Sequence, residues 1–491
     1  MSQSPPTEPT GFGPLSTLPP ERRRTPWLEA LAVVVVVALI GLGVWLVLDR
    51  NQPGGSASPS PSPTPVADAT PSPTAPSTSP PATESPSASP GTTASGEPSA
   101  TPDGTGGSLP PDIAAQIDEV IAGVPPIRQL EPIREVPYQF VTREQFQVDL
   151  QEMIDEEIDP EQFAAEEFVY KRLGLLPDDM DLREALLELY GSQVAAFYRP
   201  DTGTYYIIGE TGDLSAMDRV IVAHEYDHAL QDQHYDLEGT RITDLSEGDA
   251  ALAQTAVIEG DASLVMTQWA FGNLTQAEIL GLGGELNPAD LELLESMPPI
   301  LRRQLEFPYN EGLFWALEVF ASDFGWGSIN EALADPPPST EQILHSDKFF
   351  ADEQPIDVTI ASLTDALGSG WSTDYSQTFG ELGVQVWVGG GEEPSEGIPG
   401  LPAEQPHADV AAGWGGDRLV LYEDGADGWA IAWDLAWDTP DDADEFLARA
   451  QQLQSTLDGE SLVLAAGSDR VQVLLAHDQA TLAALAGALT R

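Results

Sequence analysis

The chain has 491 residues, enough for two or three globular domains, and 41% of them are apolar, so a sizeable core is expected. Its formal net charge of −60, from 80 acidic and 20 basic residues, would repel nucleic acid and anionic lipid, and neither is expected as a partner. The sequence has no cysteine, which excludes disulfides, thiolate metal sites and cysteine nucleophiles. Lysine occurs only at Lys171 and Lys348, a bias that is typical of a GC-rich genome or a salty habitat, so the acidity need not reflect function.

The first apolar segment lies near the start of the sequence. Residues 1–26 are polar and end in a run of arginines, and residues 27–48 are apolar with Glu29 as their one charge. This length fits the roughly 20 residues of a membrane-spanning helix and exceeds the apolar part of a cleavable signal peptide, which is about 7–15 residues. The arginines precede the span, so the positive-inside rule predicts a cytoplasmic tail, a single span in the bilayer, and an outward-facing remainder.

Residues 49–110 consist almost entirely of Pro, Ser, Thr, Ala and Gly. Such a segment cannot bury enough apolar surface to offset the entropy of folding, so we expect a disordered linker that acts as a stalk.

The folded part is predicted to be α+β, with a mainly helical domain over residues 111–369 and a smaller α+β lobe over residues 370–491. A β-hairpin around the turn residues Pro200-Asp-Thr-Gly203 precedes the central helices. The expected helices of the first domain are 112–123, 143–172, 181–190, 215–233, 247–272 and several within 287–333. The hairpin strands are 193–198 and 204–208. The lobe is expected to have strands at 384–388, 419–422, 429–433, 462–465 and 471–475, and helices at 440–456 and 478–489.

The helix predicted at 215–233 carries the residues that point to chemistry. Positions four apart on a helix are offset by only about 40°, so His224 and His228 lie one turn apart on the same face and can reach one zinc ion. Glu225 is one step round from His224, where its carboxylate can take a proton from a water that zinc activates. The alternative is a pair of core histidines with satisfied hydrogen bonds, or a metal site without activity.

HExxH on a helix is the signature of the zincin metallopeptidases. The stretches AHEYDHALQDQHYDLE, VIEGDAS and PPPSTEQILH resemble a family of bacterial membrane-anchored metallopeptidases in that group, over roughly residues 112–350. The resemblance implies that His224 and His228 bind zinc, that Glu225 is the general base, and that the reaction is peptide-bond hydrolysis outside the cell.

A third protein ligand is needed, and two residues compete for the role. His234 has the offset of the third histidine of the metzincins, but Gln231 stands where that pattern needs a glycine for its sharp turn. Glu259 lies on the mostly apolar helix 247–272, where an ionised carboxylate is costly unless a cation meets it. Gly260 would let this helix approach the motif helix closely, and the resemblance to the gluzincin branch favours Glu259.

Other roles have weaker support from the sequence. Tyr309 and His345 are candidates for steadying the reaction's oxyanion, and Asp232 and Asp261 for bonding to the zinc histidines, although packing and capping roles fit each of them. Two rival functions stay open: a non-catalytic surface protein in which zinc joins two helices, and a zinc hydrolase of non-peptide substrates. The sequence fixes neither the substrate nor the oligomeric state.

Overall fold

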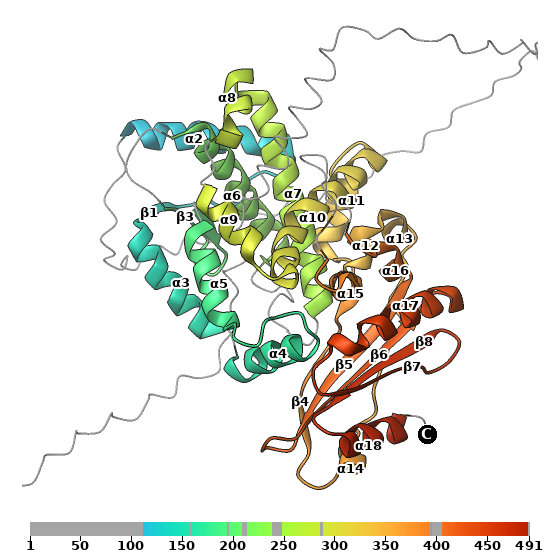
Figure 1. The fold of residues 1–491 in the computed structure, drawn as a ribbon. Coiled ribbons are helices and arrows are strands. Elements are labelled where there is room, and N and C mark those ends of the chain that lie inside the picture. Colours follow the sequence, from blue (N-terminus) through green and yellow to red (C-terminus); the bar gives the residue numbers. More distant parts are fainter. Residues whose placement is uncertain are drawn as a thin grey trace, which may run out of the picture.

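The computed structural model describes the chain from residue 111 to 489, except for residues 158, 194–195, 209–213, 238–247, 285–287, 393 and 395–404. Helices and two β-sheets make an α+β protein, as predicted (Figure 1). The predicted tail, membrane span and linker (1–26, 27–48 and 49–110) lie outside the described residues. Among the described helices none has both the length and the apolar character needed to cross a membrane.

The smaller sheet has the strand order β1-β3-β2. Strands β2 (Ala196–Arg199) and β3 (Thr204–Ile208) form the predicted antiparallel hairpin, which leaves β2 at one edge. Strand β1 (Tyr138–Val141) pairs in parallel with β3 and was not predicted. The hairpin precedes the motif helix in the chain and packs against it, so its edge strand lies beside the motif residues.

The helices before the hairpin follow the predicted order with different ends. Helix α2 (Pro111–Arg128) continues through two prolines, and α5 (Leu182–Gln193) begins as expected. Residues 143–172 form two helices, α3 (Arg143–Glu157) and α4 (Pro160–Arg172). The break lies at Asp159, whose carboxylate accepts a hydrogen bond from the Glu161 amide and caps α4. Proline at the first position of α4 suits a helix start, because its missing N–H is not needed there.

Three long helices form the centre of the first domain: α6 (Ala216–Tyr235), α7 (Gly248–Asn273) and α10 (Pro299–Asp323). A Cβ on Gly260 of α7 would collide with the backbone carbonyl of Gly312 on α10, and a Cβ on Gly312 would collide with the Ala256 carbonyl. The close approach that Gly260 permits is therefore to α10, not to the motif helix α6 as the sequence suggested.

Shorter helices complete this domain around the three long ones. They are α8 (Gln276–Gly281), the 3₁₀ turn η5 (Leu282–Gly284), α9 (Pro288–Ser296), α11 (Gly327–Ala334), α12 (Glu341–Leu344) and α13 (Ser346–Phe350). Helix α14 (Thr364–Leu367) follows them in the chain and packs on the larger sheet.

The larger sheet is antiparallel throughout, in the order β4-β5-β6-β8-β7. Helices α15 and α17 cover one face, while α14 and α18 cover the other (Figure 1). The bounds are β4 (Ser372–Gln377), α15 (Gly380–Gly389), α16 (Ala408–Ala411), β5 (Trp414–Glu423), β6 (Trp429–Trp437), α17 (Pro440–Leu453), η6 (Gln454–Thr456), β7 (Glu460–Ala465), β8 (Arg470–Ala476) and α18 (Gln479–Leu489). Trp414, Trp433 and Trp437 are buried in its core.

One predicted strand is wrong: residues 384–388 belong to helix α15. The alternation of valines favours a strand, but every residue of this helix is buried, so the sequence carries no polar face to reveal its period. Helix α15 starts where Asp417 of β5 accepts hydrogen bonds from the backbone amides of Phe379 and Gly380, both at 2.8 Å. A contact from a neighbouring strand therefore sets the start of this helix.

The start of α15 also fits against the first turn of α7. Thr340 donates to Asp249 from its hydroxyl at 2.6 Å and from its amide at 3.2 Å, and the Leu382 amide donates to the same hydroxyl at 3.2 Å. Gly380 has φ of +74°, and a Cβ there would overlap the Asp249 carboxylate. The larger sheet and the helix that carries Glu259 are thus joined by direct contacts.

The burial of Asp249 predicts a pH-dependent stability. Burial raises the pKa of Asp249 to about 8, well above its ordinary 3.8, so its contribution to stability is present at low pH and is lost as the pH rises through about 8. The stability of Asp249→Asn relative to the parent should therefore rise between pH 4 and pH 8, by up to about 5 kcal/mol. Thermal midpoints of both proteins across this range measure the difference. A difference between Asp249→Asn and the parent that stays constant from pH 4 to pH 8 would contradict the prediction.

Candidate metal centre

Helices α6 and α7 bring three candidate ligand atoms together in the buried centre of the first domain. The Nε2 atoms of His224 and His228 are 3.0 Å apart. Glu259 Oε2 lies 3.1 Å from the first and 3.4 Å from the second. The side chains of both histidines are 0% exposed, and Glu259 is 1% exposed. The helical spacing predicted from the sequence thus places both imidazoles on one face of α6, and α7 brings the Glu259 carboxylate to them.

The geometry of these three atoms fits a metal ion. A regular tetrahedral zinc site with bonds of about 2.0–2.1 Å has about 3.3 Å between ligand atoms. The three observed separations, 3.0, 3.1 and 3.4 Å, are close to that value. Two imidazoles and a carboxylate are also a donor set that zinc takes in proteins. The residues present could therefore hold a divalent cation.

Electrostatics point the same way. Burial favours a neutral Glu259, but His228 and His224 outweigh it and hold the pKa of this carboxyl at about 2. Burial lowers the pKa of His224, which favours the neutral ring with a free lone pair. An ionised Glu259 in this buried centre needs a positive charge beside it, and a bound cation would supply it.

Glu225 lies next to this centre, on the side of the small sheet. Its Oε2 accepts a hydrogen bond from the backbone amide of Tyr198, on edge strand β2, at 3.1 Å. Its Oε1 has no hydrogen-bond partner among the described residues although the side chain is 0% exposed. Burial, reinforced by the charge of Glu259, raises the pKa of Glu225, while His228 opposes this. One carboxylate oxygen is therefore held in place and the other is unengaged beside the candidate ligands.

Sequence reasoning missed a residue that touches the centre. Gln231 Oε1 lies 2.9 Å from His228 Nδ1, and Gln231 Nε2 lies 2.9 Å from Asp261 Oδ2. Asp261, one of the two candidates for bonding to a zinc histidine, reaches His228 only through this amide and is paired with the buried Arg128. The sequence feature that could have identified Gln231 is its polar side chain three positions after His228, on the same face of the helix.

Of the remaining candidates, His234 and Asp232 bond away from the three ligand atoms, whereas Tyr309 lies beside His224. His234 Nε2 bonds to the Glu131 carbonyl at 2.9 Å and does not join the three ligand atoms. Asp232 accepts from the Tyr198 hydroxyl and from Arg134, both at 2.7 Å. The Tyr309 ring is buried with its centroid 6.3 Å from that of His224.

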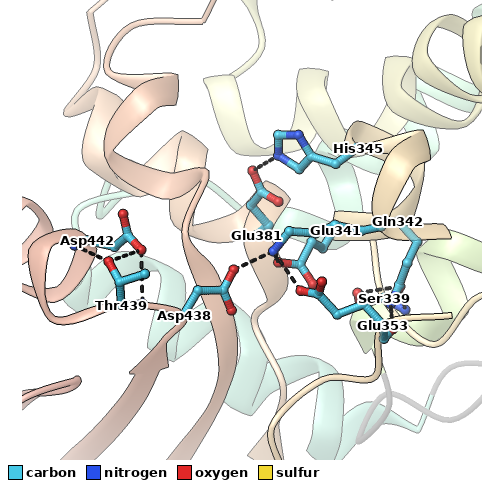
Figure 2. A network of polar contacts seen from close by, with 10 residues as sticks. Ser339, Glu341, Gln342, His345, Glu353, Glu381, Asp438, Thr439 and Asp442 are labelled. Atoms are coloured by element: carbon cyan, nitrogen blue, oxygen red, sulfur yellow. Dashed lines mark hydrogen bonds and ion pairs between the residues drawn. The ribbon is translucent and has the colours of Figure 1, made fainter. Parts of the chain in front are cut away.

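His345, the other residue considered for the oxyanion, pairs with Glu381 of α15 at 2.9 Å (Figure 2). Close by, three carboxylates converge in a second acidic group, on Glu341, Glu353 and Asp438 (Figure 2). The Lys348 ammonium lies among them, at 2.5, 3.0 and 2.5 Å respectively. An internal cation therefore already balances this group, and it links α13 to the end of β6.

Comparison with known proteins reaches only the C-terminal part. Residues 370–488, which hold the larger sheet, match a family described as Domain of unknown function (DUF8575). No curated protein and no solved structure matches the chain. The candidate ligands and Glu225 lie outside the matched segment, so the function of the centre has to be argued from its own residues.

Proposed function

We propose that the protein is a zinc-dependent metallopeptidase with a zincin-like catalytic domain, in which His224, His228 and Glu259 hold the metal. The observation that carries the proposal is the meeting of these three ligand atoms beside Glu225, whose Oε1 is buried and has no partner among the described residues. The likeness of the motif segments to membrane-anchored metallopeptidases supports the same reaction. We propose further that residues 27–48 anchor the protein in a bacterial cell membrane, with the catalytic domain outside.

The chemistry divides between the metal and the side chains. Zinc bound here would polarise the substrate carbonyl and lower the pKa of a water toward 7. Glu225 takes a proton from that water and passes it to the leaving amine. The hydrogen bond from the Tyr198 amide fixes one oxygen of Glu225, so the other keeps a set direction.

The burial of the centre favours a second candidate, a non-catalytic protein in which zinc only joins α6 to α7. His224, Glu225 and His228 are 0% exposed, and a site closed to water is what a purely structural metal needs. Hydrolysis would require a local movement that admits the peptide. The two candidates differ in one measurable property: both bind zinc, and only the first cleaves peptides.

Metal analysis combined with a peptidase assay tests the proposal. The purified protein should contain one zinc ion and cleave casein or an unstructured peptide. A chelator should abolish cleavage, and added zinc should restore it, because the proposed reaction needs the metal ion that the three ligands hold. Zinc bound without cleavage of any peptide tried would favour the structural role instead.

The choice of third ligand has its own test. Glu259→Ala should lose most of the bound zinc, since it removes one of three protein ligands and leaves two imidazoles facing each other in the core. His234→Ala is the matched control and should keep its zinc, because His234 bonds to a backbone carbonyl at the surface. Metal content after dialysis against a weak chelator measures both, and the reverse result would assign the metal to His234.

A further inference from the structure

We propose that Gln231 is a positioning residue for the metal centre. Its side-chain amide sets the protonation of His228, so that Nε2 of this ring is free for the metal, and it ties α6 to α7 beside Glu259. The inference rests on the proposed zinc site and concerns a residue that the HExxH motif does not contain.

The surroundings of the amide fix which end carries the hydrogens. Gln231 Nε2 faces three oxygens, from Asp261 Oδ2 at 2.9 Å, the Ile258 carbonyl at 3.0 Å and Asp227 Oδ2 at 3.3 Å. All three accept hydrogen bonds, so the NH₂ group must be at this end and the carbonyl Oε1 at the other.

The orientation of the amide then decides the tautomer of His228. Gln231 Oε1 lies 2.9 Å from His228 Nδ1 and can only accept, so Nδ1 must carry a proton. A neutral imidazole has one N–H, which leaves the lone pair on Nε2. This is the nitrogen that lies 3.0 Å from His224 Nε2 and 3.4 Å from Glu259 Oε2.

The same amide also joins the two helices next to the ligands. Its acceptor Ile258 directly precedes Glu259 in α7, and Asp261 follows two residues later. Asp261 is in turn paired with Arg128 of α2, whose second contact is Asn330 at 2.7 Å. Gln231, His228, Asp261 and Arg128 are each 0% exposed, so the chain of contacts from the ligand to α2 runs wholly inside the domain.

Glutamine suits this position better than the alternatives of similar size. A glutamate would still accept from His228, but its second anionic oxygen would face Asp227 and Asp261. A methionine would leave the His228 N–H without its acceptor in the core. Gln231→Glu therefore removes only the contact to α7, whereas Gln231→Met removes the contacts to α7 and to the ligand.

Zinc affinity of the demetallated full chain tests this, measured by competition with a chromophoric chelator. Gln231→Met should weaken zinc binding by about 10- to 100-fold, as expected when the partner of a metal-bound histidine is lost. Gln231→Glu should keep the affinity within about threefold, because its carboxylate still accepts from His228, while the thermal midpoint of the metal-free protein falls. Gln233→Met is the matched control: its amide bonds to Ile133 and Arg134 and touches no candidate ligand, so zinc affinity should not change.

Four results would overturn the inference. The first is that Gln231→Met binds zinc as tightly as the parent. The second is that both Gln231 variants lose affinity in step with their thermal midpoints, which would assign Gln231 a purely structural role. If Gln231→Met does not fold, Gln231→Glu decides alone, and loss of its zinc affinity counts against the proposal. A parent chain that binds no zinc would remove the metal centre and this inference together. Zinc binding without peptide cleavage would remove only the peptidase.

Discussion

Replacing Glu225 by glutamine should lower peptide cleavage by about 10²- to 10⁴-fold and leave zinc bound. The substitution keeps the size of the side chain and an oxygen that accepts from the Tyr198 amide at the 3.1 Å position. It removes the basic oxygen that would take the proton from water. The result is measured as kcat on a fluorogenic peptide, together with zinc content and thermal midpoint of the same preparation.

A matched control for this variant is Glu331→Gln on the exposed side of α11, which makes the same chemical change away from the centre and should cleave at the parent rate. Equal cleavage by Glu225→Gln and the parent would exclude Glu225 as the base. Loss of zinc in Glu225→Gln would show that the Glu225 carboxylate is needed for metal binding.

Adding one methyl group at Gly260 should destabilise the protein by about 3 kcal/mol, close to the upper range for overpacking a core. The new Cβ would overlap the Gly312 backbone carbonyl of α10, and a backbone cannot swing aside as a long side chain can. Because Glu259 directly precedes Gly260, forcing α7 away from α10 should also disturb the metal site. Chemical denaturation and zinc affinity of Gly260→Ala measure the two effects.

The same helix offers the control for this prediction. Gly272, near the exposed end of α7, has open space around it, so Gly272→Ala should be neutral or should stabilise by about 0.5–1 kcal/mol. A Gly260→Ala protein as stable as Gly272→Ala would mean that α7 and α10 are not in backbone contact.

Much of the candidate site follows from local sequence rules. The spacing of His224 and His228 needs only a helix to put both rings on one face, and the structure places them there. Glu259 was identified because a carboxylate on an apolar helix needs a positive partner, and it lies at hydrogen-bond distance from His224. These inferences worked because each depends on one element and on the period of a helix.

The parts that could not be predicted depend on contacts between distant segments. Strand β1 exists because Tyr138–Val141 pairs with β3, more than 60 residues later, and four residues alone carry too weak a pattern. Helix α15 is buried on all sides, so its valines mimic a strand. The contacts of Gln231 involve Asp261 of another helix, and Asp261 in turn pairs with Arg128 of a third.

The meeting of Gly380 with the Asp249 carboxylate bears on how this protein is assembled from parts. The segment that matches a family model, residues 370–488, includes Gly380 but not Asp249. Gly380, at the start of α15, lies so close to Asp249, in the first turn of α7, that any side chain larger than a hydrogen atom would overlap the Asp249 carboxylate. A related segment from another protein would therefore fit against α7 only if it carried glycine at the position of Gly380.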